Sequence, residues 1–324
     1  MQSSRRMLAF IDVAANLTDP MFSGVYNQVE RHARDLSLVL DRAREAGVFR
    51  IFITAGSVDM AKEAIELAKD SASLFSTVGI HPTRCDVFMD TQDSINLQHI
   101  KNLADIAASA QDKIVAVGEC GLDYDRLQFC DKVRQQIGFE YHFLLAEQLK
   151  LPMLFHNRNT DGDFVKIVRK HRNRFQNGVV HSFTGNEEEL QQLLDLDLYI
   201  GVNGCSLKTE ENLRVVQKIP LHRLVLETDC PYCEIRKTHA GYHWIQSHWK
   251  SVSYKKYEPT SCVKGRTEPC HIRQVAEIVS QLFQVSIEQV AKQAFHNTMK
   301  IFFPNESESG NYESLFETVR HHRS

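Results

Sequence analysis

Four side chains of the metal-ligand type follow apolar runs at widely separated points of this sequence: Glu119, His156, His181 and Asp229. Two imidazoles and two carboxylates brought to one place could hold Zn²⁺, Mn²⁺ or Mg²⁺. A single histidine after an apolar run is more often a structural residue, but four residues in the same kind of position are hard to explain in that way. A carboxylate buried there without a cation or a proton would also be costly to desolvate. We therefore expect these four residues to bind metal together.

Four further polar residues lie near the ends of apolar runs and could contact the metal or a substrate: Asp12, Asn16, His81 and Arg158. Asp12 and Asn16 could add oxygen ligands, although Asn16 is equally suited to cap a helix or form a turn. His81 could contact substrate or the metal pocket, or it could be structural. Arg158 could hold a phosphate oxygen, and an ordinary salt bridge would explain it almost as well.

Two other patterns have both a chemical and a structural interpretation. Residues 230–233 form a C-x-x-C motif, which can mark a thiol redox centre or, together with Cys262 and Cys270, a zinc site. The motif follows Asp229 and has no thioredoxin-like context, so ordinary loop cysteines are the favoured interpretation. The basic run at 166–174 is interpreted as a solvated helix face, with phosphate contact as the alternative.

The apolar runs that carry these residues alternate with segments of helical periodicity. Eight such strand and helix repeats favour the α/β class and a parallel (β/α)₈ TIM-type barrel. The strand ends of such a barrel converge on one mouth, where the loops after the strands build the active site. The expected strands are 8–12, 49–54, 74–79, 114–119, 152–156, 178–181, 198–201 and 224–227, and the expected helices between them are 31–46, 58–69, 95–108, 133–150 and 187–194.

The domain organisation expected from these elements is simple. A flexible N-terminus at 1–7 precedes a single barrel domain at 8–304, and a flexible polar tail follows at 305–324. After Asp229 we expect a long loop over the barrel mouth, and then two helices at about 271–283 and 286–302.

Composition limits the classes of protein that the chain can belong to. Of its 324 residues 43% are hydrophobic and 24% charged, as in globular proteins with a large core. The formal net charge of -3 gives no global basic field, so a polyanionic substrate would have to be met by local Lys and Arg or by metal. The eight cysteines lack framework spacing and no apolar run is long enough for a membrane span. We expect a monomer with reduced thiols in the cytoplasm and/or nucleus.

At these residues the chain resembles the TatD family of metal-dependent deoxyribonucleases, from about Phe10 to Phe303, and within it the eukaryotic branch. The stretch 266–269 looks like the closing motif of that family, in which an Arg and a Glu-Pro precede a C-terminal helix. The other matching stretches are 12–18, 79–82, 118–123, 156–158, 181–185 and 227–232.

The resemblance implies hydrolysis of DNA phosphodiester bonds by a metal-activated water, as a 3′-5′ exonuclease and/or an endonuclease. It further implies one or two divalent cations, with Glu119 bridging them, His156 and His181 binding one, and Asp229 binding the other. Glu119 and Asp229 would be the catalytic residues. DNA would be the substrate.

The chain departs from the family pattern on its first strand. Many members carry a His-x-His pair where this sequence has Ala14 and Asn16. The loss of two imidazoles favours Mg²⁺ or Mn²⁺ over two tightly bound Zn²⁺ ions. Two alternatives to a nuclease remain at this point: an amidohydrolase-type enzyme that cleaves C–N or ester bonds of a small molecule, and a non-catalytic metal-binding scaffold.

Overall fold

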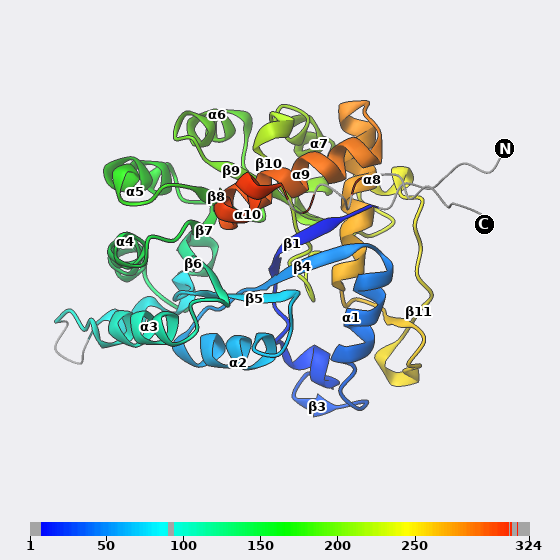
Figure 1. The fold of residues 1–324 in the computed structure, drawn as a ribbon, viewed down its shortest axis with the longest axis horizontal. Coiled ribbons are helices and arrows are strands. Elements are labelled where there is room, and N and C mark those ends of the chain that lie inside the picture. Colours follow the sequence, from blue (N-terminus) through cyan, green and yellow to red (C-terminus); the bar gives the residue numbers. More distant parts are fainter. Residues whose placement is uncertain (1–7, 90–93, 311, 313–315, 317–324) are drawn as a thin grey trace.

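Eight parallel strands form one sheet in the computed structural model, in the order β1-β4-β5-β6-β7-β8-β9-β10. The structure describes residues 8–89, 94–310, 312 and 316. The first and last strands meet at their carboxyl ends, where Ala15 and Cys230 form a bridge and the Asp229 N–H donates to the Ala14 carbonyl at 2.8 Å. Figure 1 shows the strands at the centre and the helices around them. The predicted (β/α)₈ barrel is confirmed.

Each strand overlaps one of the predicted strands, and the boundaries differ most at β6. That strand does not end at Glu119 but continues to Asp123, and all of its residues are buried. The eight strands are β1 (Phe10–Ala15), β4 (Val48–Ile53), β5 (Leu74–Val78), β6 (Ile114–Asp123), β7 (Met153–Arg158), β8 (Gly178–Val180), β9 (Tyr199–Val202) and β10 (Leu224–Leu226).

Seven helices among the described residues connect the strands. The basic run at 166–174 overlaps α5, and its side chains form exposed ion pairs, such as Lys170 with Glu140, as expected of a solvated face. Helix α7 was not predicted, although Thr209 and Asn212 form a capping box at its start. The connecting helices are α1 (Leu36–Glu45), α2 (Val58–Ala68), α3 (Gln98–Ser109), α4 (Lys132–Leu149), α5 (Asp163–His171), α6 (Glu187–Asp195) and α7 (Glu210–Val216).

The buried apolar residues form two main groups. One group lies between the strands and the outer helices. The other fills the barrel from alternate positions of the strands, such as Ile11 and Val13 of β1, because successive side chains point to opposite faces. Phe295 and Met299 of α9 (Ile287–Phe302) belong to this inner group. Helix α9 therefore covers the amino ends of the strands and leaves the carboxyl ends open.

A long segment follows β10. The prediction placed it over the barrel mouth, but it lies on the outside of the barrel beside α1 (Figure 1), where the Pro259 carbonyl accepts from Arg42 Nη1 at 3.2 Å. The segment contains β11 (Ser251–Val252) and β12 (Cys262–Val263), which pair with each other, and it leads into α8 (Ile272–Phe283). A second short pair, β2 (Val25–Tyr26) and β3 (Val29–Glu30), follows β1.

The two ends of the chain were predicted to be flexible. Residues 304–309, at the junction with the expected tail, form helix α10 (Pro304–Ser309), and the ring of Phe316 lies 5.2 Å from that of Phe295. Residues 1–7 and most of the tail beyond 310 lie outside the described residues. Within the described part of the chain, no helix has the length and apolar character needed to cross a membrane.

Candidate metal centre

Glu119, His156 and His181 come together at the carboxyl ends of β6, β7 and β8. The Oε1 atom of Glu119 lies 2.7 Å from His156 Nδ1 and 2.7 Å from His181 Nε2. The two ring nitrogens are 3.3 Å apart. Three atoms that can each donate an electron pair to a cation therefore face one point.

The backbone around Gly118 directs Glu119 toward this point. The register of β6 against β7 shifts between Val117 and Cys120, and Gly118 has a φ of 152° that favours glycine. A β-carbon at Gly118 would lie only 2.2 Å from the Leu154 carbonyl oxygen. The glycine before Glu119 thus allows β6 and β7 to approach closely and to bulge at the metal-ligand position.

Asp123 and His81 complete the polar surroundings of His156. Asp123 Oδ2 lies 3.2 Å from His156 Nε2. His81 Nε2 lies 3.6 Å from Glu119 Oε1, and its ring meets that of His156 edge-on with centroids 4.7 Å apart. His81, Asp123 and His156 form a second group of possible ligands beside Glu119, His156 and His181. His81 lines the cavity, and its Nδ1 atom also accepts from the Thr83 N–H at 3.2 Å, so its position suits both roles considered for it.

Asp229 borders the same cavity as these ligands but has its own set of contacts. Its Oδ1 atom accepts a hydrogen bond from Asn16 Nδ2 at 3.0 Å, and its Oδ2 atom accepts one from Cys233 Sγ at 3.3 Å. Asn16 Oδ1 in turn accepts from Thr54 Oγ1 at 2.8 Å. Asn16 therefore orients Asp229 from the end of β1. Its own amide oxygen is already used by Thr54.

Asp12 and Arg158 differ in how they relate to the cavity. The Asp12 carboxylate is buried and accepts from the backbone N–H and the hydroxyl of Thr228, at 2.9 and 2.5 Å. It supports the segment before Asp229 and does not line the cavity. Arg158 does line the cavity, while its Nε donates to Asp125 Oδ2 at 2.9 Å. The salt bridge considered for Arg158 is therefore present.

Several residues of the site were not singled out from the sequence. The site lies in a cavity of about 750 Å³ whose wall also contains Arg84, Arg126, Phe129 and Tyr232. The two aromatic residues are 57% and 48% exposed. Among the described residues, no ion pair is formed by either of the two arginines. Guanidinium groups and aromatic rings at the cavity wall suit a ligand with phosphates and planar bases.

Glu227, like Asp123, is a buried carboxylate near the site that was not singled out from the sequence. Its Oε1 atom accepts from the Ser182 N–H at 2.6 Å and from Asn203 Nδ2 at 2.9 Å, and it lies 3.7 Å from His181 Nδ1. A carboxylate behind a metal-binding imidazole fixes the orientation of the ring.

Burial and neighbouring charges set the protonation of the site. Burial alone would raise the pKa of Glu119, but the charges of His181 and His81 hold it well below its usual value. Burial opposes a charge on His181, yet Glu119 raises the pKa of that ring well above its usual value. Burial raises the pKa of Asp229 to about 6 and that of Asp12 to about 8.

The donor set fits a divalent cation. The buried Glu119 carboxylate faces two imidazoles whose nitrogens are 3.3 Å apart, and a cation between these three groups would offset the charge of the carboxylate. Carboxylate and imidazole ligands suit Zn²⁺ and Mn²⁺, and the oxygens of Glu119, Asp123 and Asp229 also suit Mg²⁺. Glu119, His156 and His181 would hold one cation, and Asp229 faces the same cavity.

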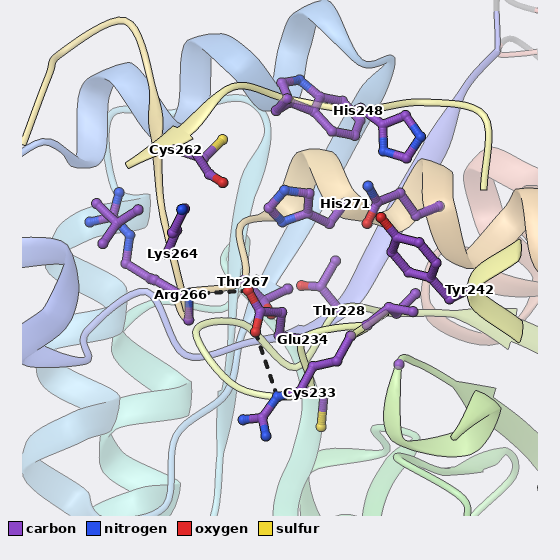
Figure 2. Close-up of a pocket in the computed structure, with 18 of the residues that line it drawn as sticks. Thr228, Cys233, Glu234, Tyr242, His248, Cys262, Lys264, Arg266, Thr267 and His271 are labelled. Carbon is purple, nitrogen blue, oxygen red and sulfur yellow. Dashed lines mark hydrogen bonds and ion pairs between the residues drawn. The ribbon is translucent and has the colours of Figure 1, made fainter. Parts of the chain in front are cut away.

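A second, smaller cavity of about 430 Å³ is lined in part by the long segment after β10 (Figure 2). Cys262, Cys270 and His271 form a third ligand-type group beside it. The Glu268 N–H donates to His271 Nδ1 at 2.9 Å, which leaves the proton of the neutral ring on Nε2 and so disfavours metal binding there. Cys230 and Cys233 are not in this group, so the four-cysteine zinc site considered from the sequence is not formed.

A parallel α/β barrel with imidazole and carboxylate side chains at the carboxyl ends of its strands defines a class, the TIM-barrel metal-dependent hydrolases. The sequence profile described as "TatD related DNase" matches residues 11–303. The chain therefore belongs to the TatD related DNase family, which confirms the resemblance noted in the sequence.

Individual relatives agree with this assignment along nearly the whole chain. The chain is 39% identical over 308 residues to the Deoxyribonuclease Tat-D of Schizosaccharomyces pombe, covering 93% of this chain and 97% of that protein. It is 31% identical over 295 residues to the 3′-5′ ssDNA/RNA exonuclease TatD of Yersinia pseudotuberculosis, with coverages of 90% and 98%. The crystal structure of a hydrolase TatD family protein from Entamoeba histolytica matches with a TM-score of 0.85 at 36% identity, covering 93% and 100% of the two chains.

Proposed function

We propose that this chain is a metal-dependent deoxyribonuclease that hydrolyses phosphodiester bonds of DNA. The observation that carries the proposal is the convergence of Glu119, His156 and His181 on one point inside a cavity bordered by arginines. Membership of the TatD related DNase family decides between this reaction and the C–N or ester hydrolysis that the same fold supports. Because a Yersinia relative is named a 3′-5′ exonuclease, we propose this polarity for the chain, with endonuclease action as a further possibility.

The chain's own residues divide the work of this reaction. Glu119, His156 and His181 hold the cation, and Asp229 accepts the proton of the attacking water, since a carboxyl whose pKa is about 6 is mostly ionised above neutral pH. Asn16 keeps the Asp229 carboxylate oriented. A divalent cation in this place would supply a Lewis acid, which activates water and balances the negative charge on the phosphate.

We propose Mg²⁺ or Mn²⁺ as the cation, with Zn²⁺ as the alternative. Position 14 is alanine and position 16 is an asparagine that is bonded to Asp229 and Thr54. Neither residue offers an imidazole on the first strand, so oxygen makes up much of the ligand set near Asp229. Hard cations prefer such oxygen ligands.

The test is cleavage of end-labelled single- and double-stranded DNA of defined length. We expect cleavage with Mg²⁺ or Mn²⁺, loss of cleavage in EDTA, and a fall in kcat of at least about 100-fold in Glu119→Gln. Glu188→Gln, on the exposed side of α6, is the matched control and should keep full activity. Full activity of Glu119→Gln, or cleavage that resists EDTA, would refute the proposal.

We further propose that residues 8–304 act as a single domain in a monomer, located in the cytoplasm and/or nucleus. The site residues named above all come from one chain, so no second subunit is needed to complete it. Light scattering of the purified protein tests the monomer, and tagged protein in cells tests the location.

A further inference from the structure

Two of the eight cysteines differ from the others in position and exposure. All eight are free thiols, and Cys205 and Cys233 are the two that are not buried. Both line the cavity of the candidate metal centre. Their Sγ atoms are 2.8 Å apart. Thiols that are accessible and adjacent can be oxidised together, whereas buried thiols are inert.

The fold itself brings the two thiols together. Cys205 follows β9, and its N–H donates to Asn203 Oδ1 at 2.8 Å, while Cys233 lies in the loop after β10. A β-carbon at Gly204 would lie 1.9 Å from the Cys233 carbonyl oxygen. The two loops therefore touch at the backbone, and a glycine at 204 is what permits it.

Cys233 also contacts the candidate catalytic carboxylate directly. Its thiol donates to Asp229 Oδ2 at 3.3 Å. Cys233 borders both cavities, and in Figure 2 its sulfur points away from the second cavity, which contains Cys262 and His271. The sulfur of Cys233 thus contacts Cys205 and Asp229, and a change in its bonding changes the surroundings of Asp229.

We propose that Cys205 and Cys233 form a reversible disulfide that lowers the activity of the adjacent metal centre. The regulatory part rests on the proposed nuclease function. The oxidant is a peroxide: one thiol is oxidised to a sulfenic acid as the first water leaves, and the other thiol displaces the second water to form the S–S bond. Two thiols lose two electrons and two protons, and hydrogen peroxide is reduced to two waters. A small dithiol reverses the step by exchange.

Disulfide formation changes the surroundings of Asp229 in a defined way. The Cys233 sulfur no longer has a proton, so Asp229 Oδ2 loses its donor and only the bond from Asn16 at 3.0 Å remains of the two side-chain bonds. The S–S bond also draws the Cys233 sulfur toward Cys205. We expect kcat to fall about fivefold, from the loss of this weak hydrogen bond together with the movement of the Cys233 sulfur beside Asp229.

The disulfide is tested first, by a measurement independent of nuclease activity. Protein treated with hydrogen peroxide is alkylated and digested, and linked peptides are identified by mass spectrometry. We expect the 205–233 link in the wild type and in Cys262→Ser, the matched control in the other cysteine group, and no such link in Cys205→Ser. Alkylation of both Cys205 and Cys233 after oxidation, or links that join other cysteines instead, would overturn the proposal.

The regulation is then tested by the ratio of oxidised to reduced activity on single-stranded DNA, taken within each variant. The wild type and Cys262→Ser should show the fivefold fall and regain activity with dithiothreitol, and Cys205→Ser should give a ratio near one. Full activity of the linked protein would overturn the regulation while the disulfide stands. If reduced protein with Mg²⁺ or Mn²⁺ cleaves no DNA, the proposed function and its regulation both fail, and the peptide map still decides the disulfide.

Discussion

Asp229 is held by one strong donor, the Asn16 amide, and one weak donor, the Cys233 thiol. An asparagine at 229 would remove the charge and turn an NH₂ group toward one of these donors. We expect Asp229→Asn to lower kcat by at least about 100-fold, and Asn16→Ala, which removes a donor to Asp229 but keeps its charge, by about 10-fold. Steady-state kinetics on labelled DNA measure both. Equal losses in the two variants, or a lowered urea midpoint in Asp229→Asn, would contradict this division of roles.

The arginines of the cavity wall differ in whether they already form an ion pair with an acidic side chain. Arg126 is exposed on the cavity wall, whereas Arg158 is paired with Asp125 at 2.9 Å. We expect Arg126→Ala to raise KM several-fold with kcat unchanged, and to lessen the salt dependence of DNA binding by about one phosphate contact. Arg158→Ala is the matched comparison and should have a smaller effect. A larger effect at Arg158 would mean that the ion pair opens when DNA binds.

The four main ligand-type residues could be predicted because each comes after an apolar run, and the carboxyl-terminal parts of the strands of a barrel converge on one mouth. Asp123 was missed because the predicted strand ended at Glu119, whereas β6 continues through the bulge to Asp123. Asp12 was considered as a ligand because it is an acidic residue on the first strand, but the contacts of its carboxylate with Thr228 depend on β1 meeting β10. Contacts across the barrel closure are tertiary and have no local sequence signal.

At the scale of the elements, His142 joins helix α4 to the end of β5. Its Nε2 atom accepts from the Ile80 N–H at 2.9 Å and its Nδ1 atom bonds the Gly138 carbonyl at 2.7 Å. Burial lowers the pKa of His142 to about 4, whereas an unfolded histidine has a pKa of about 6.5. The neutral ring of His142 therefore favours the folded state. Its contribution to the free energy of unfolding is complete above about pH 6.5 and falls as the pH drops toward 4.

We expect the titration of His142 to lower the free energy of unfolding by about 2 kcal/mol when the pH is lowered from 7 to 5. His142→Gln keeps an acceptor for the Ile80 N–H but cannot titrate, so its loss of stability over this range should be smaller by that amount. Urea unfolding of both proteins at the two pH values gives the comparison. Parallel pH profiles would show that His142 is not the group that titrates.

The elements were easier to predict than their ends. All eight strands were found from apolar runs, because a parallel barrel buries both faces of each strand. Helix α1 begins at Leu36 and not near 31, and Asp35 just before it is bonded to Arg266, a contact with no local sequence signal. Helix α7 is short, and its capping box at Thr209 was the one local signal that could have revealed it.

At the scale of the whole molecule, the barrel fold fixes where the site lies but leaves the reaction open. Backbone bonds between residues 14–16 and 229–230 close the sheet beside the cavity, so the closure of the sheet also places Asp229 at the site. The same barrel could hydrolyse C–N bonds, and it is the match to the TatD related DNase family over residues 11–303 that separates the alternatives.

The closure is reinforced outside the sheet by a buried ion network around Arg266. Its guanidinium donates to both oxygens of Asp35, at 2.8 and 2.7 Å, and to Glu268 Oε1 at 2.9 Å. The side chains of all three residues are at most 1% exposed. Arg42 of α1 adds two bonds to Glu268, at 2.7 and 3.0 Å. The network joins the start of the first outer helix to the segment before α8.

Removal of Arg266 would leave Asp35 without its cationic partner and Glu268 with Arg42 alone. We expect Arg266→Ala to lower the free energy of unfolding by about 3–5 kcal/mol, because a buried charge that loses its partner is strongly destabilising. Arg44→Ala, which breaks the exposed pair with Asp41, should change it little, because solvent already screens that pair. Urea denaturation of the two variants measures the difference. Similar stabilities would mean that water reaches the Arg266 network and that the closing motif contributes little to holding the barrel together.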